Sequence, residues 1–278
     1  MLFKSRRDKR QTFISREGLR SDSDNGAYVA FVEQTLTDHS LFHHFKKSPV
    51  YQQILEHTTE EQGRQYLALI CEQAPHFLDL LDRFAVNDLV GGANVIQFND
   101  RCRISPSTLR YAKVASDLHS LFGTSLEGGH VAEIGVGYGG QRLVLDQLYR
   151  FRSYDMYDLP PVLGLASKYL ESHLLQSSYR TKTLNTHNGE KEYDLVISNY
   201  AFSELPAIVQ RMYIEKVLQK AARGYLTMNS GRVDSVFSKG KMTLEEIQTL
   251  ISNTRILEEK PCSAPGNYVL VWGSAGLD

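Results

Sequence analysis

Short apolar segments alternate with amphipathic segments from residue 124 to the C-terminus, and this alternation limits the possible folds more than any other feature. The apolar segments have the length of single β-strands: HVAEIG, RSYDMYD, YRTKTLN, YDLVISN, GYLTMNS, TRILEEK and NYVLVWG. The segments between them have helical spacing: GQRLVLDQLYRF, VLGLASKYLESHLL, PAIVQRMYIEKVLQKA and TLEEIQTLIS. This pattern predicts an α/β fold, a mostly parallel sheet covered by helices on both faces. Because the turn sequence PCSAPGN joins the last two of the seven strands, we expect the last strand to be antiparallel.

The chain divides into three regions by the same criterion. Residues 1–23 are basic and polar, and they are expected to form a mobile tail. Residues 24–123 show helical spacing and predict an all-helical cap, which could also supply a homodimer surface. Residues 124–278 carry the alternating pattern and predict a Rossmann-like sheet domain.

Local signals place two helices in the cap. Thr58 and Glu61 form a capping-box pattern before the helix EEQGRQYLALICEQ, and a loop is expected at VNDLVGGANVIQFNDRC. Ser105 supplies an N-cap and Pro106 a first-turn proline for a second helix, which ends at Gly123. This second helix is expected to lead into the sheet domain.

Charge and cysteine usage exclude several classes of protein. The 31 Lys and Arg residues against 32 Asp and Glu give a net charge of -1, so no general field attracts nucleic acid or an anionic membrane. No apolar run is long enough to span a bilayer. The cysteines Cys71, Cys102 and Cys262 lack the spacing of a disulfide framework or a zinc site. These features predict a cytoplasmic protein.

No metal site is expected. His39, His43 and His44 share a helix face, but no carboxylate or cysteine completes a ligand set. Adjacent acidic residues are explained by helix starts or by an exposed strand end: Glu60–Glu61, Glu245–Glu246 and Glu258–Glu259. The chemistry is therefore expected to be independent of metal.

The first strand of the sheet domain leads into a glycine-rich turn, VAEIGVGYGGQ. Gly135, Gly137 and Gly140 match the G-x-G-x-x-G spacing of dinucleotide-binding folds, and Gly139 adds a fourth glycine. The spacing permits more than one cofactor, because any strand-to-helix turn that approaches a ligand needs glycine. Glu133 favours S-adenosylmethionine, since a carboxylate there can reach its amino group and would repel a pyrophosphate. Alternatively, Glu133 is a structural carboxylate with a buried partner.

Two further positions are predicted to hold this cofactor. Asp158 and Leu159 close the second strand, where the carboxylate can accept both ribose hydroxyls, although Asp158 could also cap the following helix. Arg110 lies in the helix that enters the sheet domain. Its guanidinium could pair with the cofactor carboxylate, or it could form a surface salt bridge instead.

Polar residues at the third and fourth strands are assigned to the ligand site only because of their position. In open α/β sheets, ligands bind beyond the carboxyl ends of the strands. Asn185 and Thr186 follow the third strand, near the expected adenine edge. Asp194, Ser198 and Asn199 belong to the fourth strand and its end, and they are expected to face the methyl donor.

Four segments together resemble a known family: ISPSTLRY, VAEIGVGYGGQ, YDLPPVLGLASKYL and DLVISNYAFSEL. They are similar to the sugar O-methyltransferase family of class I S-adenosylmethionine-dependent methyltransferases, over about Ile104 to Gly273. Asp158–Pro160 also resembles the ribose-binding stretch of plant small-molecule O-methyltransferases. Val136 departs from the family, which usually has glycine there. The resemblance implies S-adenosylmethionine as donor, S-adenosylhomocysteine as product, and a sugar or sugar-nucleotide hydroxyl as acceptor.

Methyl transfer to a hydroxyl needs positioning and a general base more than covalent machinery. Glu204 is the first candidate base because it lies near Asn199, although it could equally be a first-turn carboxylate of a helix opening at Pro206. His187, after the third strand, is the second, although a histidine on a surface loop is commonly only solvated. Tyr200 could line the acceptor pocket or belong to the core.

The residues leave other functions open. The acceptor could be another small molecule or a nitrogen atom, because both reactions use the same donor site. The glycine spacing also allows a nicotinamide-dependent oxidoreductase. A scaffold that binds the cofactor without turnover would carry the same motifs.

Overall fold

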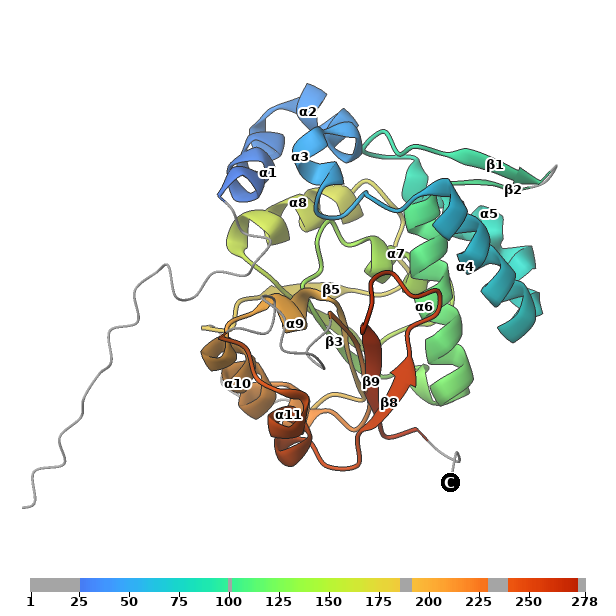
Figure 1. Cartoon of the computed structure of the whole chain (residues 1–278). Coiled ribbons are helices and arrows are strands. Elements are labelled where there is room, and N and C mark those ends of the chain that lie inside the picture. The colour runs from blue at the N-terminus through green and yellow to red at the C-terminus, as the bar shows by residue number, and fades with distance from the viewer. Residues whose placement is uncertain (1–25, 100–101, 186–191, 230–239, 275–278) are drawn as a thin grey trace, which may run out of the picture.

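The computed structural model describes residues 26–99, 102–185, 192–229 and 240–274. Within them, seven strands form one sheet in the order β5-β4-β3-β6-β7-β9-β8. Figure 1 shows this sheet in the lower half of the molecule. The strands are β3 (His130–Ile134), β4 (Ser153–Tyr157), β5 (Tyr179–Lys182), β6 (Leu195–Asn199), β7 (Gly224–Met228), β8 (Arg255–Glu258) and β9 (Tyr268–Trp272). The first five are parallel to one another, and β9 is antiparallel to both of its neighbours. The predicted sheet, with its antiparallel last strand, is confirmed.

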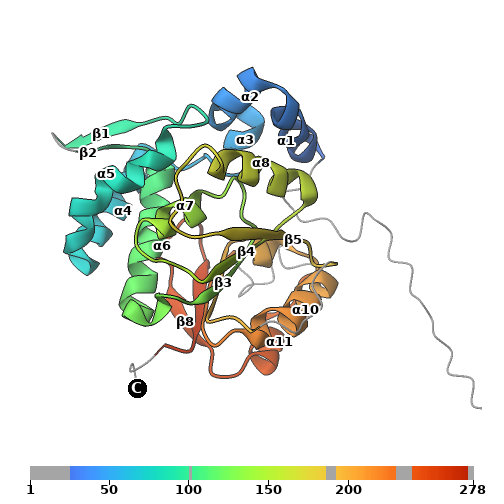
Figure 2. The ribbon, with the colours of Figure 1, turned by 180° about the vertical axis from the view of Figure 1, so that it is seen from behind.

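Alternate residues of the strands face two separate hydrophobic cores. Val131 of β3 points into one core and Ala132 into the other. The helices of the first core are α6 (Pro106–Phe122), α7 (Gly140–Asp146) and α8 (Pro160–Leu170), and those of the second are α10 (Ala207–Lys216) and α11 (Leu244–Leu250). Figures 1 and 2 show these helices on two sides of the sheet. The Rossmann-like fold class predicted from the sequence is therefore confirmed.

The part of the chain before α6 forms short helices and one hairpin. Its elements are α1 (Ala27–Thr37), α2 (His39–His44), α3 (Pro49–Gln52), α4 (Glu60–Gln73), α5 (Leu81–Phe84), β1 (Ile96–Asn99) and β2 (Cys102–Ile104). The described residues also include the short helix α9 (Ala201–Glu204) and five 3₁₀ turns: Phe45–Lys47, Pro75–Leu80, Ala85–Asp88, Gly123–Leu126 and Leu218–Lys220. The expected helical region is present.

The β1–β2 hairpin lies where a loop was expected, so this region is not all-helical. Phe98 of β1 packs directly on Gly63 of α4, because a Cβ atom on Gly63 would lie 2.8 Å from Phe98 Cζ. The Arg64 guanidinium carbon also lies 5.4 Å from the centre of the Phe98 ring. A two-stranded ribbon is marginal by itself, and this contact with α4 supports it.

The caps of the two longest helices show one correction. The capping box of α4 is Thr59 with Gln62, one residue later than predicted: the Gln62 amide donates to Thr59 Oγ1 (3.2 Å) and the Thr59 amide to Gln62 Oε1 (2.9 Å). Both threonines have a suitable partner three residues on, so the spacing could not choose between them. For α6 the prediction is confirmed, since Ser105 Oγ accepts from the Thr108 amide (3.1 Å) and the helix ends at Gly123.

The N-terminal helices share a core with the sheet. Phe45 and Val131 belong to one continuous buried cluster. Helix α1 lies along α8 (Figure 1), and Lys168 Nζ of α8 donates to the carbonyls of Thr35 (2.8 Å) and Leu36 (3.1 Å). No described helix is long and apolar enough to span a bilayer. The sheet and the helices above it are therefore packed as one body.

Candidate active site

The strand order reverses between β3 and β6, so the loops at their carboxyl ends diverge. The crevice between two such loops is where ligands bind in open α/β sheets. The turn after β3 contains Gly135, Gly137 and Gly139, with φ angles of 76°, 53° and 88°, which other residues rarely adopt. A Cβ atom on Gly135 would lie 2.0 Å from Cβ of Ala201, where α9 (Ala201–Glu204) begins. The glycine turn is therefore in close contact with the segment that follows β6.

Side chains from the N-terminal region and α6 cover the rest of this turn. A Cβ atom on Gly137 would lie 2.9 Å from Leu55 Cδ1, which belongs to the segment between α3 and α4. A Cβ atom on Gly140, the first residue of α7, would lie 2.6 Å from the Tyr111 ring. Only glycine fits at these two positions without displacing the side chains above them.

Asp158 follows β4 and binds the glycine turn. Its Oδ2 accepts from the Gly137 amide (3.2 Å) and its Oδ1 from the Leu159 amide (2.7 Å). Burial raises the pKa of Asp158 to about 6, and these backbone hydrogen bonds oppose the shift. The N-cap of α8 is Leu159, so the structure does not use Asp158 as that cap. An ionised carboxylate has about four acceptor sites, so capacity for ligand hydroxyls is left.

Glu133 is buried at the end of β3, with 2% of its surface exposed. Tyr154 Oη donates to Glu133 Oε2 at 2.6 Å. Burial raises the pKa of Glu133 to about 8, while the Tyr154 hydrogen bond and the nearby Arg142 act in the opposite direction. Glu133 thus has a buried partner, Tyr154, as a carboxylate with a structural role would need. A contact between Glu133 and the cofactor stays a prediction.

The end of β6 carries Ser198 and Asn199. Ser198 Oγ donates to Ile134 O (2.8 Å) and accepts from the Phe202 amide (3.0 Å), so this hydroxyl joins β3 to α9. Asn199 Nδ2 donates to Gln141 Oε1 (3.2 Å). Its buried Oδ1 has no hydrogen-bond partner in the part of the chain that the structure describes. Asn199 therefore presents an unused acceptor at the switch point.

Tyr200 has a strained backbone, with φ 67° and ψ -35°. This combination lies near the rare γ-turn region with positive φ, which is costly for a bulky residue. The Tyr200 amide donates to Thr227 O (2.9 Å) and its carbonyl accepts from the Ser203 amide (2.9 Å). The fold thus holds Tyr200 in this conformation from both sides.

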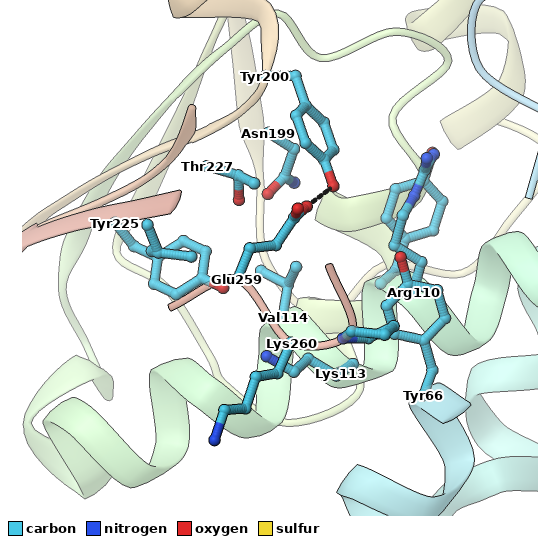
Figure 3. Close-up of a pocket in the computed structure, with 13 residues that line it drawn as sticks. Tyr66, Arg110, Lys113, Val114, Asn199, Tyr200, Tyr225, Thr227, Glu259 and Lys260 are labelled. Atoms are coloured by element: carbon cyan, nitrogen blue, oxygen red, sulfur yellow. Dashed lines mark hydrogen bonds between the residues drawn. The ribbon is translucent and has the colours of Figure 1, made fainter. Parts of the chain in front are cut away.

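A pocket lies beside Tyr200, between α4, α6, β7 and the segment after β8. Figure 3 shows Tyr200 and Glu259 pointing toward each other in it, and Tyr200 Oη donates a short hydrogen bond to Glu259 Oε1. Glu259 is only 6% exposed. The expectation of an exposed strand end is therefore wrong for Glu259, although its neighbour Glu258 is exposed as expected. Glu259 lies just after β8, and its carboxylate accepts hydrogen bonds from Tyr200 and from the Ser263 amide.

Arg110 of α6 lines the same pocket. One of its guanidinium nitrogens donates to Leu55 O (3.0 Å), and no carboxylate lies within salt-bridge distance among the described residues. The surface salt bridge considered as an alternative is absent from these residues. An arginine has five N–H donors, so this side chain can also bind an anionic group of a ligand.

Two other candidates, Glu204 and Asn185, do not line this pocket. Glu204 is the last residue of α9 and does not belong to the helix that follows Pro206. Its Oε1 accepts from Asn229 Nδ2 (3.2 Å). Asn185 is exposed after β5. Thr186 and His187 lie outside the described residues. The roles assigned to all four stay predictions.

The placement of Asp194 at the ligand end of the sheet was wrong. Asp194 precedes β6, and its Oδ2 accepts from the His130 amide (2.7 Å) at the amino-terminal edge. Within the described ranges, no group of three or more His, Cys, Asp or Glu side chains is arranged to hold a metal ion.

Comparisons with known proteins give structural matches only, since no protein-family model and no curated protein matches the chain. The methyltransferase domain of bacterial CtHen1 has a TM-score of 0.44 and 14% identity, over 58% of this chain and 96% of that one. Monomeric WbdD also gives 0.44 and 14%, over 59% of this chain but only 41% of WbdD. Magnesium protoporphyrin IX methyltransferase (ChlM) from Synechocystis PCC 6803 with bound SAH gives 0.42 and 16%, over 74% and 97%. These likenesses carry no conclusion about activity.

Proposed function

We propose that this chain is an S-adenosylmethionine-dependent methyltransferase that transfers a methyl group to a hydroxyl of a sugar or sugar nucleotide. One observation carries the proposal: the Asp158 carboxylate binds the glycine turn at Gly137, beside the switch point of a seven-stranded Rossmann-like sheet. A carboxylate in this position would accept the ribose hydroxyls of the cofactor.

The residues at the switch point fit this cofactor. Asp158 would accept the ribose hydroxyls, and the unpaired Asn199 Oδ1 would accept from the amino group of the methionyl part. Arg110 would bind its carboxylate, with Asn185 and Thr186 near the adenine. The cofactor, when bound, supplies a methyl group that is already activated on a sulfonium.

The residues around the pocket would bind and orient the acceptor. Tyr66 and Tyr111 line it, and tyrosine combines an apolar ring that stacks on a sugar face with a hydroxyl that bonds to it. The resemblance to sugar O-methyltransferases supports a sugar in this position. Holding the acceptor hydroxyl in line with the methyl group, away from water, is the main contribution that such a site makes.

Titration calorimetry with S-adenosylmethionine and S-adenosylhomocysteine tests the cofactor. We expect Asp158→Ala to weaken the affinity for S-adenosylhomocysteine at least about tenfold, because each hydrogen bond to a charged group contributes about 1.5–3 kcal/mol. Asp79→Ala, which removes an exposed carboxylate, is the matched control and is expected to bind normally. A folded sample that binds neither compound but binds NADH would instead be an oxidoreductase.

Turnover tests the reaction itself. Wild-type protein with S-adenosylmethionine and a panel of nucleoside diphosphate sugars is expected to give a methyl ether, detected by mass spectrometry. Binding without transfer to any sugar of the panel would favour a cofactor-binding scaffold. Transfer to an amino group in place of a hydroxyl would keep the methyltransferase and change the acceptor.

A further inference from the structure

Glu259 is a buried carboxylate that the proposed function has not used. The Ser263 amide and the Ser263 hydroxyl donate to it at 2.9 Å and 2.8 Å, and Asn267 Nδ2 in turn donates to Ser263 Oγ at 2.9 Å. No cation lies within salt-bridge distance of Glu259 among the described residues. A carboxylate is rarely buried without a cationic partner, because removing its charge from water costs free energy. A functional role for Glu259 would explain why the fold accepts this cost.

Tyr200 faces this carboxylate from the end of β6. Residues in sparsely populated backbone regions cost about 1–3 kcal/mol each, and they persist where the surrounding structure fixes them. The hydrogen bonds to Thr227 and Ser203 fix Tyr200 here. The fold thus holds the Tyr200 phenol against the buried Glu259 (Figure 3).

We infer that Tyr200 and Glu259 form a proton relay that takes up the proton of the acceptor hydroxyl, an inference that rests on the proposed function. As the acceptor oxygen forms its bond to the methyl carbon, the bond between that carbon and sulfur breaks. The acceptor proton moves to Tyr200 Oη, and the phenolic proton of Tyr200 moves to the Glu259 carboxylate. After the product leaves, the proton passes from Glu259 to water and the pair is restored.

The direction of the existing hydrogen bond suits this relay. Tyr200 already donates to Glu259, and Ser263 Oγ lies 3.3 Å from the same oxygen. A phenol oxygen has two lone pairs, so it can also accept from a hydroxyl in the pocket. Burial raises the pKa of Tyr200, and the charge of Glu259 raises it further. The phenol therefore stays protonated until a second proton reaches it, which is the behaviour of a relay and not of a tyrosinate base.

The remaining charges of the pocket are arranged around this pair. Lys113 is paired with Asp117 (2.6 Å) and Lys260 with Glu258 (3.7 Å). Arg110, without a carboxylate partner among the described residues, acts to lower the pKa of Tyr200. The other titratable side chains that face the pair are the phenols of the pocket wall: Tyr66, Tyr111 and Tyr225.

The first experiment needs no cofactor. The ¹³C resonance of the Tyr200 phenol carbon, assigned by its loss in Tyr200→Phe, reports the hydrogen bond from Tyr200 to Glu259. Glu259→Gln is expected to shift this resonance, because a neutral amide accepts the hydrogen bond more weakly than a carboxylate does. Glu258→Gln removes the adjacent exposed carboxylate and is the control, with the wild-type resonance expected. A resonance that is the same in Glu259→Gln and wild type would overturn the relay.

The second experiment measures turnover of a methylated sugar from the panel. Glu259→Gln is expected to lower kcat about a hundredfold or more, with KM and affinity for S-adenosylhomocysteine retained, because a general base contributes about 10²–10⁴-fold. Tyr200→Phe should cause a similar loss, and the double variant no further loss, since the two residues act as a unit.

The outcomes separate the relay from the proposed function. A Glu259→Gln protein that is folded and keeps its kcat contradicts the relay but not the proposed methyltransferase activity. A wild-type protein that binds no S-adenosylmethionine, or methylates no sugar of the panel, contradicts the proposed function, and the relay falls with it. Thermal unfolding of each variant shows whether a loss of kcat reflects a loss of fold.

Discussion

A side chain at Gly135 would meet two obstacles, one conformational and one steric. Its φ of 76° disfavours other residues, and its Cβ atom would lie 2.0 Å from that of Ala201. Gly128 has a similar φ of 71° but no atom within 4 Å of a Cβ. We expect Gly128→Ala to lower the free energy of unfolding by about 1–2 kcal/mol, and Gly135→Ala by about 3 kcal/mol or more. Urea unfolding measures both.

A double variant separates the two obstacles. Gly135→Ala combined with Ala201→Gly removes the opposing Cβ atom and is expected to recover the steric part of the loss. Equal losses for the two glycine variants, or a double variant no better than Gly135→Ala, would show that the turn and α9 are not in contact.

Glu133 makes the stability of the protein depend on pH. Its pKa of about 8 in the folded chain lies above its ordinary value of 4.5, so the folded state holds this proton more tightly than the unfolded state. Stability is therefore lost as the pH rises through this window. Glu133→Gln keeps an acceptor for Tyr154 and carries no charge. We expect it to become more stable than wild type by on the order of 4 kcal/mol across the window.

The measurement compares the free energies of unfolding of wild type and Glu133→Gln at several pH values. Glu72→Gln, which changes an exposed glutamate of α4, serves as the control and should follow wild type. A difference between wild type and Glu133→Gln that stays constant with pH would mean that Glu133 is ionised throughout.

Local sequence chemistry could predict some residues of the site and not others. Gly137 and Asp158 were found because turn geometry and strand ends impose their residue types, and the structure brings these two together. Glu259 was missed because two adjacent carboxylates look alike in the sequence, and its burial depends on contacts with Tyr200 and Ser263 that come from the folded chain. Asp194 was misplaced, although chain direction alone puts the start of a strand at the opposite edge of the sheet.

At the scale of elements, α7 is held by a buried ion pair. Arg142 and Asp146 are each fully buried, with Arg142 Nη1 2.7 Å from Asp146 Oδ1. Asp146 also accepts from the Gln176 amide (2.6 Å) and the Ser177 hydroxyl (2.9 Å). The pair therefore fixes the helix that begins in the glycine turn to the chain that enters β5.

Removing either partner should have unequal effects. Asp146→Ala leaves a buried guanidinium without its counter-charge and is expected to cost about 3–5 kcal/mol in unfolding free energy. Arg142→Met is expected to cost less, because the Asp146 carboxylate keeps its other donors. Denaturant unfolding of both variants gives the order, and a larger loss for Arg142→Met would contradict it.

The strands and helices of the sheet domain could be predicted because their hydrophobic periodicity repeats over many residues. The β1–β2 hairpin could not, since its support comes from the contact of Phe98 with Gly63, far away in sequence. The cap of α4 shows the limit of a local pattern, because Thr58 and Thr59 both satisfy it and the structure selects Thr59.

For the whole molecule, the region before the sheet and the sheet itself stabilise one another. Lys46 is buried, donates to Asn87 O (2.5 Å), and lies 4.3 Å from the ring centre of Tyr138 in the glycine turn and 4.9 Å from that of Tyr169 in α8. Residues 124–278 alone would expose these two rings. We expect this fragment to show no cooperative thermal transition, whereas the full chain unfolds in one.

Calorimetry of the fragment and the full chain checks this expectation. A fragment that unfolds cooperatively and binds S-adenosylhomocysteine would show that the sheet is autonomous. The full chain, measured under the same conditions, is the reference.

The burial of Lys46 between Tyr138 and Tyr169 also constrains how such a chain can evolve. A recombination event at the start of the sheet would join a foreign N-terminal region to two aromatic rings that it was not selected to cover. Few such exchanges would yield a folded product, because exposed aromatic surface favours aggregation. The N-terminal helices should therefore evolve by single substitutions, matched by substitutions in the glycine turn and in α8. Replacement of the whole N-terminal region by one from another protein should be rare.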